Sequence, residues 1–228
     1  MIALIDYGIS NLRSVQKAFE HLGVEVTLVD TPDQLLKADR LILPGVGAFP
    51  AGMDGLRTRG LIEPIKRAVH NGQPLLGICL GMQLLFESSD EMGDTHGLAL
   101  LPGLVTKLKM QDAWGKGYGA RGTAPDAARS DSASRIPHSA LKIPHMGWNQ
   151  IDIVRHHPLL HGVPTGAYAY FVHSYAPYPD QPDVVLATTD YGGAFTSIVG
   201  RGNVCGLQFH PEKSQAVGLQ MLRNFLEM

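Results

Sequence analysis

Cys79 lies in a short motif whose glycines and position suit a nucleophile. The motif, Gly77-Ile78-Cys79-Leu80-Gly81, follows an apolar run and precedes a run with helical spacing. A nucleophile between two such glycines, where a strand meets a helix, is typical of a nucleophile elbow, in which the glycines allow a sharp turn. The helix N-terminus favours the thiolate. Cys79 is therefore predicted to be a nucleophile, with the Leu80 N–H stabilising an oxyanion; the alternative is a buried structural cysteine in a tight turn.

A cysteine nucleophile needs a base, and His210 is the best candidate. It follows the largely apolar run Gly206-Leu207-Gln208-Phe209, as the end of a strand would, and Glu212 stands two residues later. In an extended segment, residues two apart project to the same side, so the carboxylate can hold the imidazole in one tautomer and stabilise its cation. The spacing predicts a triad of Cys79, His210 and Glu212. The alternative is a solvated His-Pro turn in which Glu212 caps the following helix.

The other histidines give weaker signals. Those at positions 156, 157 and 161 form a cluster, but a proline between them interrupts the helical spacing of a metal pair. No cysteine or carboxylate stands at ligand spacing, so we expect no metal site. His145 and His173 are expected to be structural or interfacial.

A glycine pair follows another apolar run, in Pro44-Gly45-Val46-Gly47. It does not complete the dinucleotide-binding fingerprint, because Pro50 stands where the third glycine belongs, and the chain has no phosphate-binding loop with Lys and Ser or Thr. No cofactor is predicted. The loop could still supply backbone N–H groups to a developing anion, and the alternative is an ordinary strand-to-helix turn.

The elements that must position these residues fall into two patterns. In the first half, apolar runs of strand length alternate with segments of helical spacing, which predicts an α/β fold with a mainly parallel sheet covered on both faces. The second half has short strands joined by turns, which predicts antiparallel strands added to that sheet, and a final helix. The expected strands are 2–5, 24–29, 41–43, 75–78, 168–172, 184–189, 195–199 and 204–209, and the expected helices are 11–21, 52–69, 80–86 and 215–226.

Length and composition limit the classes of protein to which the chain can belong. The chain has 228 residues, 44% of them hydrophobic and 18% charged, and a formal net charge of −2, which is typical of a globular protein without a basic nucleic-acid surface. It has no apolar run of membrane-spanning length and no signal-peptide pattern. Two cysteines are too few for a disulfide framework, so we expect a cytoplasmic protein. We expect one domain over 1–228, with a flexible polar insertion at 112–135 that contains no Val, Ile, Leu, Phe or Met.

Several segments together resemble a known family. The segments around Cys79 and His210 resemble the two signatures of class I (triad) glutamine amidotransferases. They are Gly77-Ile78-Cys79-Leu80-Gly81-Met82-Gln83 and Gln208-Phe209-His210-Pro211-Glu212. Further motifs are similar to those of the glutaminase subunits of imidazole glycerol phosphate synthase, from histidine biosynthesis. They are Asp6-Tyr7-Gly8 with Asn11-Leu12, Pro44-Gly45-Val46-Gly47-Ala48-Phe49, Pro144-His145-Met146-Gly147-Trp148-Asn149, Tyr170-Phe171-Val172-His173-Ser174-Tyr175 and Lys213-Ser214. The resemblance covers nearly the whole chain, although the segment 112–135 is longer and more polar than the family usually shows.

The resemblance implies a reaction and a partner. Cys79 would attack the side-chain amide of glutamine, giving a glutamyl thioester and ammonia, with His210 moving protons and Glu212 orienting it. Ammonia would pass to a cyclase subunit, a (β/α)8 barrel in a heterodimer, which makes imidazole glycerol phosphate and an aminoimidazole carboxamide ribotide. No nucleic acid or membrane is implied. By the same resemblance, Gly47 lies near the oxyanion, Gln83, Ser174 and Tyr175 lie near glutamine, and Asn11, Trp148, Tyr170 and Lys213 face the cyclase.

Three rival functions fit parts of the pattern. The first is the glutaminase of another amidotransferase, as in pyridoxal phosphate or anthranilate synthesis, which Trp148 and the motif at 44–49 disfavour. The second is a stand-alone cysteine peptidase or γ-glutamyl hydrolase, which would need no partner. The third is an inactive regulatory subunit, and it is the least supported because Cys79, His210 and Glu212 are all present.

Overall fold

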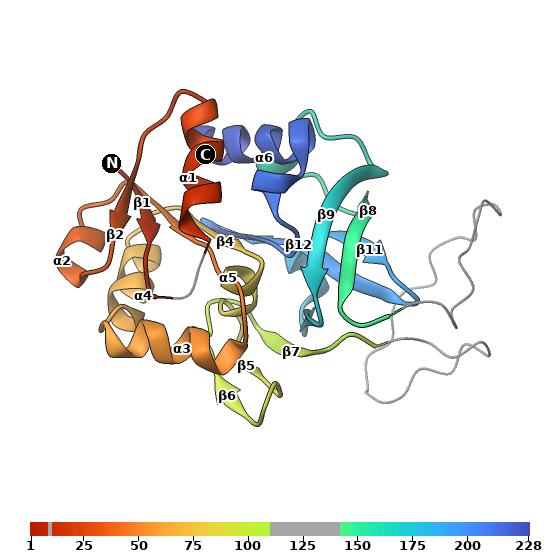
Figure 1. The fold of residues 1–228 in the computed structure, drawn as a ribbon, viewed down its shortest axis with the longest axis horizontal. Helices are drawn as coiled ribbons and strands as arrows, with labels where there is room; N and C mark the ends of the chain where they lie inside the picture. The colour runs from red at the N-terminus through yellow and green to blue at the C-terminus, as the bar shows by residue number, and fades with distance from the viewer. Residues whose placement is uncertain (9–10, 110–141) are drawn as a thin grey trace.

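A nine-stranded sheet forms the centre of the protein in the computed structural model, which describes residues 1–8, 11–109 and 142–228 (Figure 1). Its order is β2-β1-β3-β4-β13-β12-β11-β8-β9, and a second sheet has the order β10-β7-β5-β6. The strands are β1 (Ile2–Ile5), β2 (Val26–Val29), β3 (Arg40–Leu43), β4 (Leu75–Ile78), β5 (Ser88–Ser89), β6 (Thr95–His96), β7 (Gly103–Lys107), β8 (His145–Ile153), β9 (Ala167–His173), β10 (Tyr175–Pro179), β11 (Val185–Asp190), β12 (Ala194–Arg201) and β13 (Val204–Leu207).

The first five strands in this order run parallel. β1 pairs with β2 and β3, β3 pairs with β4, and β4 pairs with β13. Every residue of β4 is buried. A parallel strand that is covered on both faces needs a nearly continuous apolar sequence. For this reason the strands at the start of the chain stand out in the sequence, and their prediction is confirmed.

The remaining strands, β12, β11, β8 and β9, extend the sheet by antiparallel pairing. This confirms that the second half of the chain adds antiparallel strands to the same sheet. One strand differs from expectation: β13 pairs antiparallel with β12 but parallel with β4. A parallel neighbour requires a long crossover connection, and more than a hundred residues separate β4 from β13 along the chain.

Helices cover both faces of the parallel half of the sheet, which confirms the α/β class (Figure 1). Side chains of β1 alternate between the faces: Leu4 packs in the core under α1 and α6, whereas Ala3 and Ile5 pack in the core under α3 and α4. The helices are α1 (Leu12–His21), α2 (Pro32–Leu35), α3 (Phe49–Thr58), α4 (Ile62–His70), α5 (Leu80–Gln83) and α6 (Gln215–Glu227), with 3₁₀ turns η2 (Pro158–Leu160), η3 (Pro182–Val184) and η4 (Pro211–Lys213).

Two helix predictions were wrong in extent. The helix expected over 52–69 is two helices, because the chain turns between α3 and α4, where Gly60 has φ +65°. The helix expected over 80–86 ends at Gln83, after which the chain turns into the second sheet. The sequence analysis also missed β8 and the whole second sheet. Polar residues and glycine interrupt the apolar pattern of β8, and β5 and β6 have only two residues each.

Some expectations stay untested by the fold. The described ranges stop at Lys109 and resume at Lys142, so the predicted insertion at 112–135 lies outside them. One domain over 1–228 likewise stays a prediction. Of the helices that the structure describes, none combines the length and the apolar character that crossing a membrane requires.

Candidate active site

The turn between β4 and α5 places Cys79 at the end of the central strand. Cys79 itself adopts the unusual backbone conformation, with φ 54° and ψ −111°. The flanking glycines are required for close contacts: a Cβ on Gly81 would stand 1.7 Å from the Leu43 carbonyl oxygen, and one on Gly77 would stand 2.7 Å from the Met82 nitrogen. The predicted elbow is therefore present, but its sharp turn is at the cysteine, and the glycines let the neighbouring strand and helix approach.

His210 reaches the same edge of the sheet through β13. This strand lies parallel to β4 in a register that pairs Leu207 with Ile78, so both chains leave the sheet side by side. The Ser214 hydroxyl donates to the His210 carbonyl at 2.7 Å and accepts from the Tyr170 N–H at 3.0 Å. The His210 N–H in turn donates to the Tyr170 carbonyl at 2.9 Å. These bonds hold the loop after β13 against β9 and fix the backbone of the histidine.

Glu212 and His210 form a buried pair. Oε1 of Glu212 lies 2.8 Å from Nδ1 of His210, and the two side chains are only 1% and 7% exposed. Burial lowers the pKa of His210, but hydrogen bonds and charge interactions with Cys79 and Glu212 raise it more, so its pKa lies well above the usual value. The site therefore favours the protonated form of His210. Because Nδ1 is held by the carboxylate, Nε2 is left to face the thiol.

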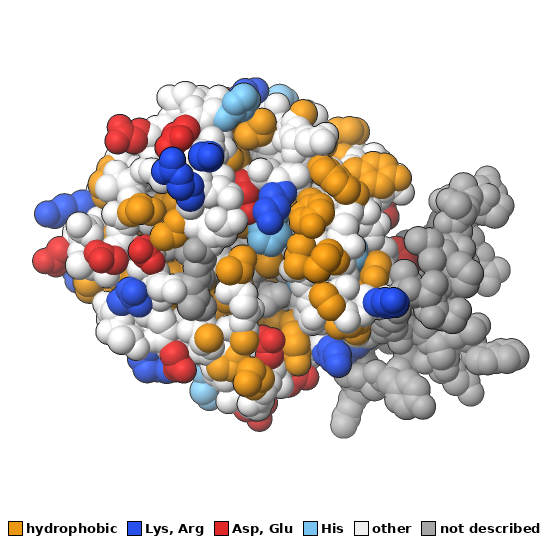
Figure 2. Space-filling model, in the orientation of Figure 1, with side chains coloured by type: hydrophobic (Ala, Val, Ile, Leu, Met, Phe, Trp, Pro, Cys, Tyr) orange, Lys and Arg blue, Asp and Glu red, His pale blue; other side chains and the backbone are white. Residues whose placement is uncertain are grey.

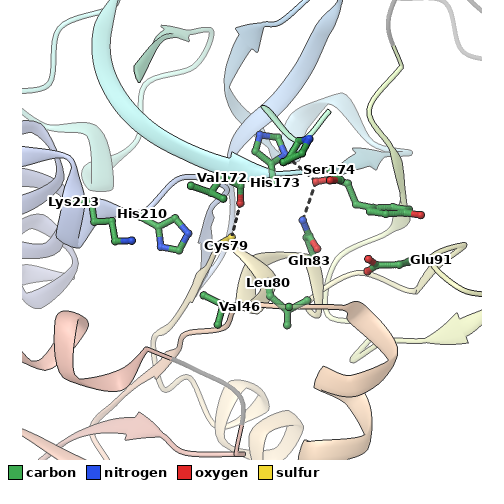
Figure 3. A pocket seen from close by; sticks show the side chains of 13 residues that line it. Val46, Cys79, Leu80, Gln83, Glu91, Val172, His173, Ser174, His210 and Lys213 are labelled. Carbon is green, nitrogen blue, oxygen red and sulfur yellow. Dashed lines mark hydrogen bonds between the residues drawn. The ribbon is translucent and has the colours of Figure 1, made fainter. Parts of the chain in front are cut away.

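A cavity of about 300 Å³ opens beside the thiol (Figure 3). Figure 3 shows His210 and Lys213 on one side of Cys79, with Gln83 and Glu91 on the other. The predicted residues that line it are Gly47, Cys79, Leu80, Gln83, Ser174, Tyr175, His210 and Lys213, and the other lining residues are Val46, Glu91, Pro144, Val172 and His173. The structure thus brings the predicted substrate residues to Cys79, whereas Asn11, Trp148 and Tyr170 do not line the cavity.

The backbone donor that we expected at the oxyanion is already engaged. The N–H of Leu80 donates to the Gly45 carbonyl oxygen at 3.3 Å. Gly45 belongs to the loop between β3 and α3, which also carries Val46 and Gly47 to the cavity wall. In this conformation the Leu80 N–H points at that loop, so it can serve an oxyanion only after the Gly45 carbonyl has moved away.

Two polar residues of the site were missed by the sequence analysis. Nε2 of Gln208 lies 3.9 Å from Cys79 Sγ, and the sheet register places this residue beside the cysteine. Glu91 lines the cavity from the turn between β5 and β6, and one of its carboxylate oxygens accepts the Phe49 N–H at 2.7 Å. The parallel pairing of β13 with β4 would have predicted Gln208. No local sequence pattern marks Glu91, because the turn that carries it lies between two strands of only two residues each.

Three of the four residues expected at a partner surface lie together, and one of them, Lys213, also lines the cavity. Trp148 and Tyr170 are paired across β8 and β9, with ring centroids 5.9 Å apart, and Nζ of Lys213 lies 5.7 Å from the centre of the Tyr170 ring. Exposed Met146 and Tyr168 lie on the same two strands. Figure 2 shows hydrophobic side chains gathered over this part of the molecule. Asn11 is exposed at the start of α1.

The histidine cluster at 156–161 lines a second hollow, on the loop that follows β8. Burial lowers the pKa of His157, and its Nδ1 accepts the Leu159 N–H at 3.2 Å. Within residues 1–8, 11–109 and 142–228, no three His, Cys, Asp or Glu side chains come close enough together to hold a metal ion.

Comparison with known proteins gives consistent matches along the chain. The family model for class I glutamine amidotransferases matches residues 3–228. The chain is 48% identical over 228 residues to "Imidazole glycerol phosphate synthase subunit HisH" of Syntrophotalea carbinolica, which covers 100% of both chains. It is also 48% identical over 225 residues to the HisH subunit of Salinibacter ruber, covering 99% of this chain and 93% of that one. A solved glutamine amidotransferase has the same fold, with a TM-score of 0.69 at 19% identity over 100% of this chain and 98% of that chain.

Proposed function

The chain belongs to the class I glutamine amidotransferases, among the HisH subunits of imidazole glycerol phosphate synthase, and from this premise we propose that it hydrolyses glutamine with Cys79, His210 and Glu212. The observation that carries the assignment is the position of Cys79 in the wall of a cavity, with a carboxylate-bound His210 of raised pKa beside it. A cysteine beside an imidazolium is an activated nucleophile.

The reaction has two steps. Cys79 Sγ attacks the side-chain amide carbon of glutamine, and His210 gives its Nε2 proton to the amide nitrogen, so that the C–N bond breaks and ammonia leaves. The glutamyl group remains on sulfur as a thioester. One water molecule, deprotonated by the now neutral His210, then attacks the thioester carbon, and the C–S bond breaks to release glutamate and restore the thiolate. Glu212 keeps the imidazole in one orientation throughout.

The cavity walls supply groups that suit glutamine. Glu91 keeps one carboxylate oxygen for the substrate ammonium group, because its other oxygen holds the Phe49 N–H. Gln83, Ser174 and Tyr175 line the same cavity and contact the rest of the amino acid. An enclosed set of polar groups of this kind distinguishes glutamine from larger peptides.

The oxyanion site forms when the Gly45–Val46 peptide turns over. This rotation frees the Leu80 N–H from the Gly45 carbonyl and turns the Val46 N–H toward the substrate, next to Gly47. Until the rotation occurs, attack on the amide lacks its main electrostatic stabilisation. The isolated chain should therefore hydrolyse glutamine slowly.

The partner is a cyclase subunit with a (β/α)8-barrel fold, bound as a heterodimer in the cytoplasm. Ammonia in water is mostly protonated and non-nucleophilic, so a sealed passage to the cyclase has a chemical reason. Trp148, Tyr170, Lys213 and Asn11 form the interface. In the cyclase, the ammonia would react with a phosphoribulosyl-formimino carboxamide ribonucleotide, which is split into imidazole glycerol phosphate and an aminoimidazole carboxamide ribotide.

Replacing the nucleophile tests the assignment. Cys79→Ala should abolish glutamate production from glutamine, since the covalent step has no substitute. The complex with the cyclase should still form product from ammonium salts, which shows that the variant is folded and assembled. Cys205→Ala is the matched control: Cys205 is fully buried in β13, where burial raises its pKa to about 12, and its loss should leave glutaminase activity in place. Glutamine hydrolysis by Cys79→Ala would overturn the triad.

A stand-alone hydrolase is the second candidate function. The effect of the partner on the rate of glutamine hydrolysis distinguishes it from an amidotransferase subunit. The measurement is glutamate release by the isolated chain, by the complex and by the complex loaded with the cyclase ligand. Equal rates in all three would favour the stand-alone enzyme.

A further inference from the structure

Two histidines that the mechanism does not use are hydrogen-bonded to each other inside the β8–β9 pair. His145 and His173 stand opposite one another in the register and are 2% and 6% exposed. Nδ1 of His145 lies 3.1 Å from Nε2 of His173. The His145 ring is stacked between Phe171 and Tyr191, with centroids 4.8 Å and 4.0 Å away. Both rings are therefore fixed in place, and their polar atoms face each other.

The partners of the two rings determine their tautomers. Burial lowers the pKa of His145 to about 3 and that of His173 to about 4, so both are neutral at pH 7. Nδ1 of His173 lies 2.9 Å from the Tyr175 carbonyl, which can only accept, so Nδ1 carries the proton and Nε2 accepts from His145. Nε2 of His145 then accepts from the Asn149 amide at 3.3 Å. All the donors point the same way, toward the Tyr175 carbonyl.

The same carbonyl connects this chain of bonds to the nucleophile. The Gln83 amide nitrogen donates to the Tyr175 carbonyl at 2.9 Å and to Oε1 of Gln208 at 3.1 Å. Nε2 of Gln208 lies 3.9 Å from Cys79 Sγ. The position of the Tyr175 carbonyl therefore sets where the Gln83 amide lies, and through it the orientation of the Gln208 amide beside the sulfur.

We infer that His145 and His173 act as a pair of positioning residues for the glutaminase reaction. The pair holds the Ser174–Tyr175 segment at the wall of the glutamine cavity and orients the Gln83 and Gln208 amides toward Cys79. This inference rests on the proposed function, because it takes the cavity to be the glutamine site. A pair that only filled the core would need rings of this size but not their hydrogen bonds.

His145 offers the cleaner test, because His173 lines the cavity and His145 does not. His145→Phe keeps an aromatic ring for the stack but removes the donor to His173. His145→Asn is the matched control, since its amide nitrogen can take the place of Nδ1 and donate to the same acceptor. Steady-state glutamate release is measured for both in the complex with the cyclase and its ligand, together with ammonium-dependent product formation as a measure of folding and assembly.

We expect His145→Phe to raise KM for glutamine about tenfold while kcat changes less than about threefold, because a misplaced wall weakens binding more than chemistry. His145→Asn should return KM to within about threefold of the unmodified complex. Unchanged kinetics in His145→Phe, or equal damage in both variants, would overturn the inference. Absence of glutamine hydrolysis in the unmodified complex would instead contradict the proposed function.

A second measurement needs no variant and stands even if His145→Phe does not fold. Nitrogen NMR of the histidine rings in the unmodified chain reports which ring nitrogen carries the proton. Both His145 and His173 should be neutral with the proton on Nδ1. A proton on Nε2 of either ring, or a charged ring at pH 7, would break the chain of donors and overturn the inference.

Discussion

At the scale of single residues, the candidate site combines a cysteine with a strained backbone and a histidine with a raised pKa. Cys79 has a positive φ that costs a residue other than glycine of order 1–3 kcal/mol. The surrounding structure holds it there through parallel strands on both sides of β4. Cys79 and the buried Glu212 both raise the pKa of His210, and Glu212 has no other charged partner among the described side chains. In the proposed reaction, these surroundings would activate both residues.

Glu212→Gln should reduce glutamine turnover by about 100-fold or more, because the amide neither controls the imidazole tautomer nor stabilises its cation. The change also removes a cause of the raised pKa of His210, which lies at about 10 in the unmodified chain. His210 donates a proton when charged, and it loses that proton as pH rises through its pKa. The alkaline limb of the rate profile should therefore move to lower pH in the variant. Turnover within about threefold of the unmodified chain, with an unshifted profile, would mean that Glu212 has only a structural role in the turn that precedes α6.

At the scale of elements, the loop between β3 and α3 would, in the proposed mechanism, control whether the oxyanion site is open. Its backbone is held from below by Tyr7, which is fully buried and donates to the Pro44 carbonyl at 2.6 Å. A Cβ on Gly45 would lie only 2.2 Å from the Tyr7 hydroxyl oxygen, so this glycine is needed for close approach. The next peptide is the one whose carbonyl accepts the Leu80 N–H. Tyr7 therefore helps to hold the loop in the conformation in which the Gly45 carbonyl accepts the Leu80 N–H.

Tyr7→Phe should make the loop turn over more easily. We expect basal glutamate release by the isolated chain to rise about fivefold, the equivalent of about 1 kcal/mol, with little change in the fully activated complex. The buried Pro44 carbonyl loses its donor, so the free energy of unfolding in urea should fall by about 1–3 kcal/mol. Tyr178→Phe is the matched control, because the Tyr178 hydroxyl also bonds to backbone, at Lys109, but in the second sheet. A basal rate that falls in Tyr7→Phe would contradict this role of the loop.

At the scale of the whole molecule, the cavity and the candidate partner surface are neighbours. Lys213 belongs to both, since it lines the cavity and lies over the Tyr170 ring. A partner that docks on Trp148 and Tyr170 would therefore touch the mouth through which ammonia leaves. Aromatic side chains of this kind commonly dominate binding energy at interfaces.

Trp148→Ala should weaken the activation of glutamine hydrolysis by the ligand-loaded cyclase more than it weakens basal turnover, and Lys213→Ala should do the same. A loss of about tenfold in activation is expected for a central aromatic anchor. Leu28→Ala is the matched control: Leu28 is 45% exposed, as Trp148 is 46% exposed, but it lies on β2 at the opposite edge of the sheet. Equal activation in Trp148→Ala and Leu28→Ala would exclude Trp148 from the interface.

The sequence by itself determined the parts of this protein that depend on local pattern. Buried parallel strands require continuous apolar runs, so β1, β3 and β4 could be predicted from the residues alone. The elbow around Cys79 and the spacing of His210 and Glu212 are also local. Residues two apart in an extended chain project to the same side, so the spacing alone predicts that these two side chains can meet.

Only the tertiary structure decided which of these segments meet. More than a hundred residues separate β4 from β13, and their parallel register alone brings His210 and Gln208 to Cys79. Glu91 reaches the cavity from a turn of the second sheet that has no marked pattern. Two further contacts depend on how peptides and rings are oriented: the hydrogen bond from the Leu80 N–H to Gly45, and the one between His145 and His173. Packing in the folded chain sets these orientations, and amino-acid composition does not. The local motifs predicted that His210 would meet Cys79, but the positions of Gln208 and Glu91 and these orientations depend on the whole fold and have no local pattern.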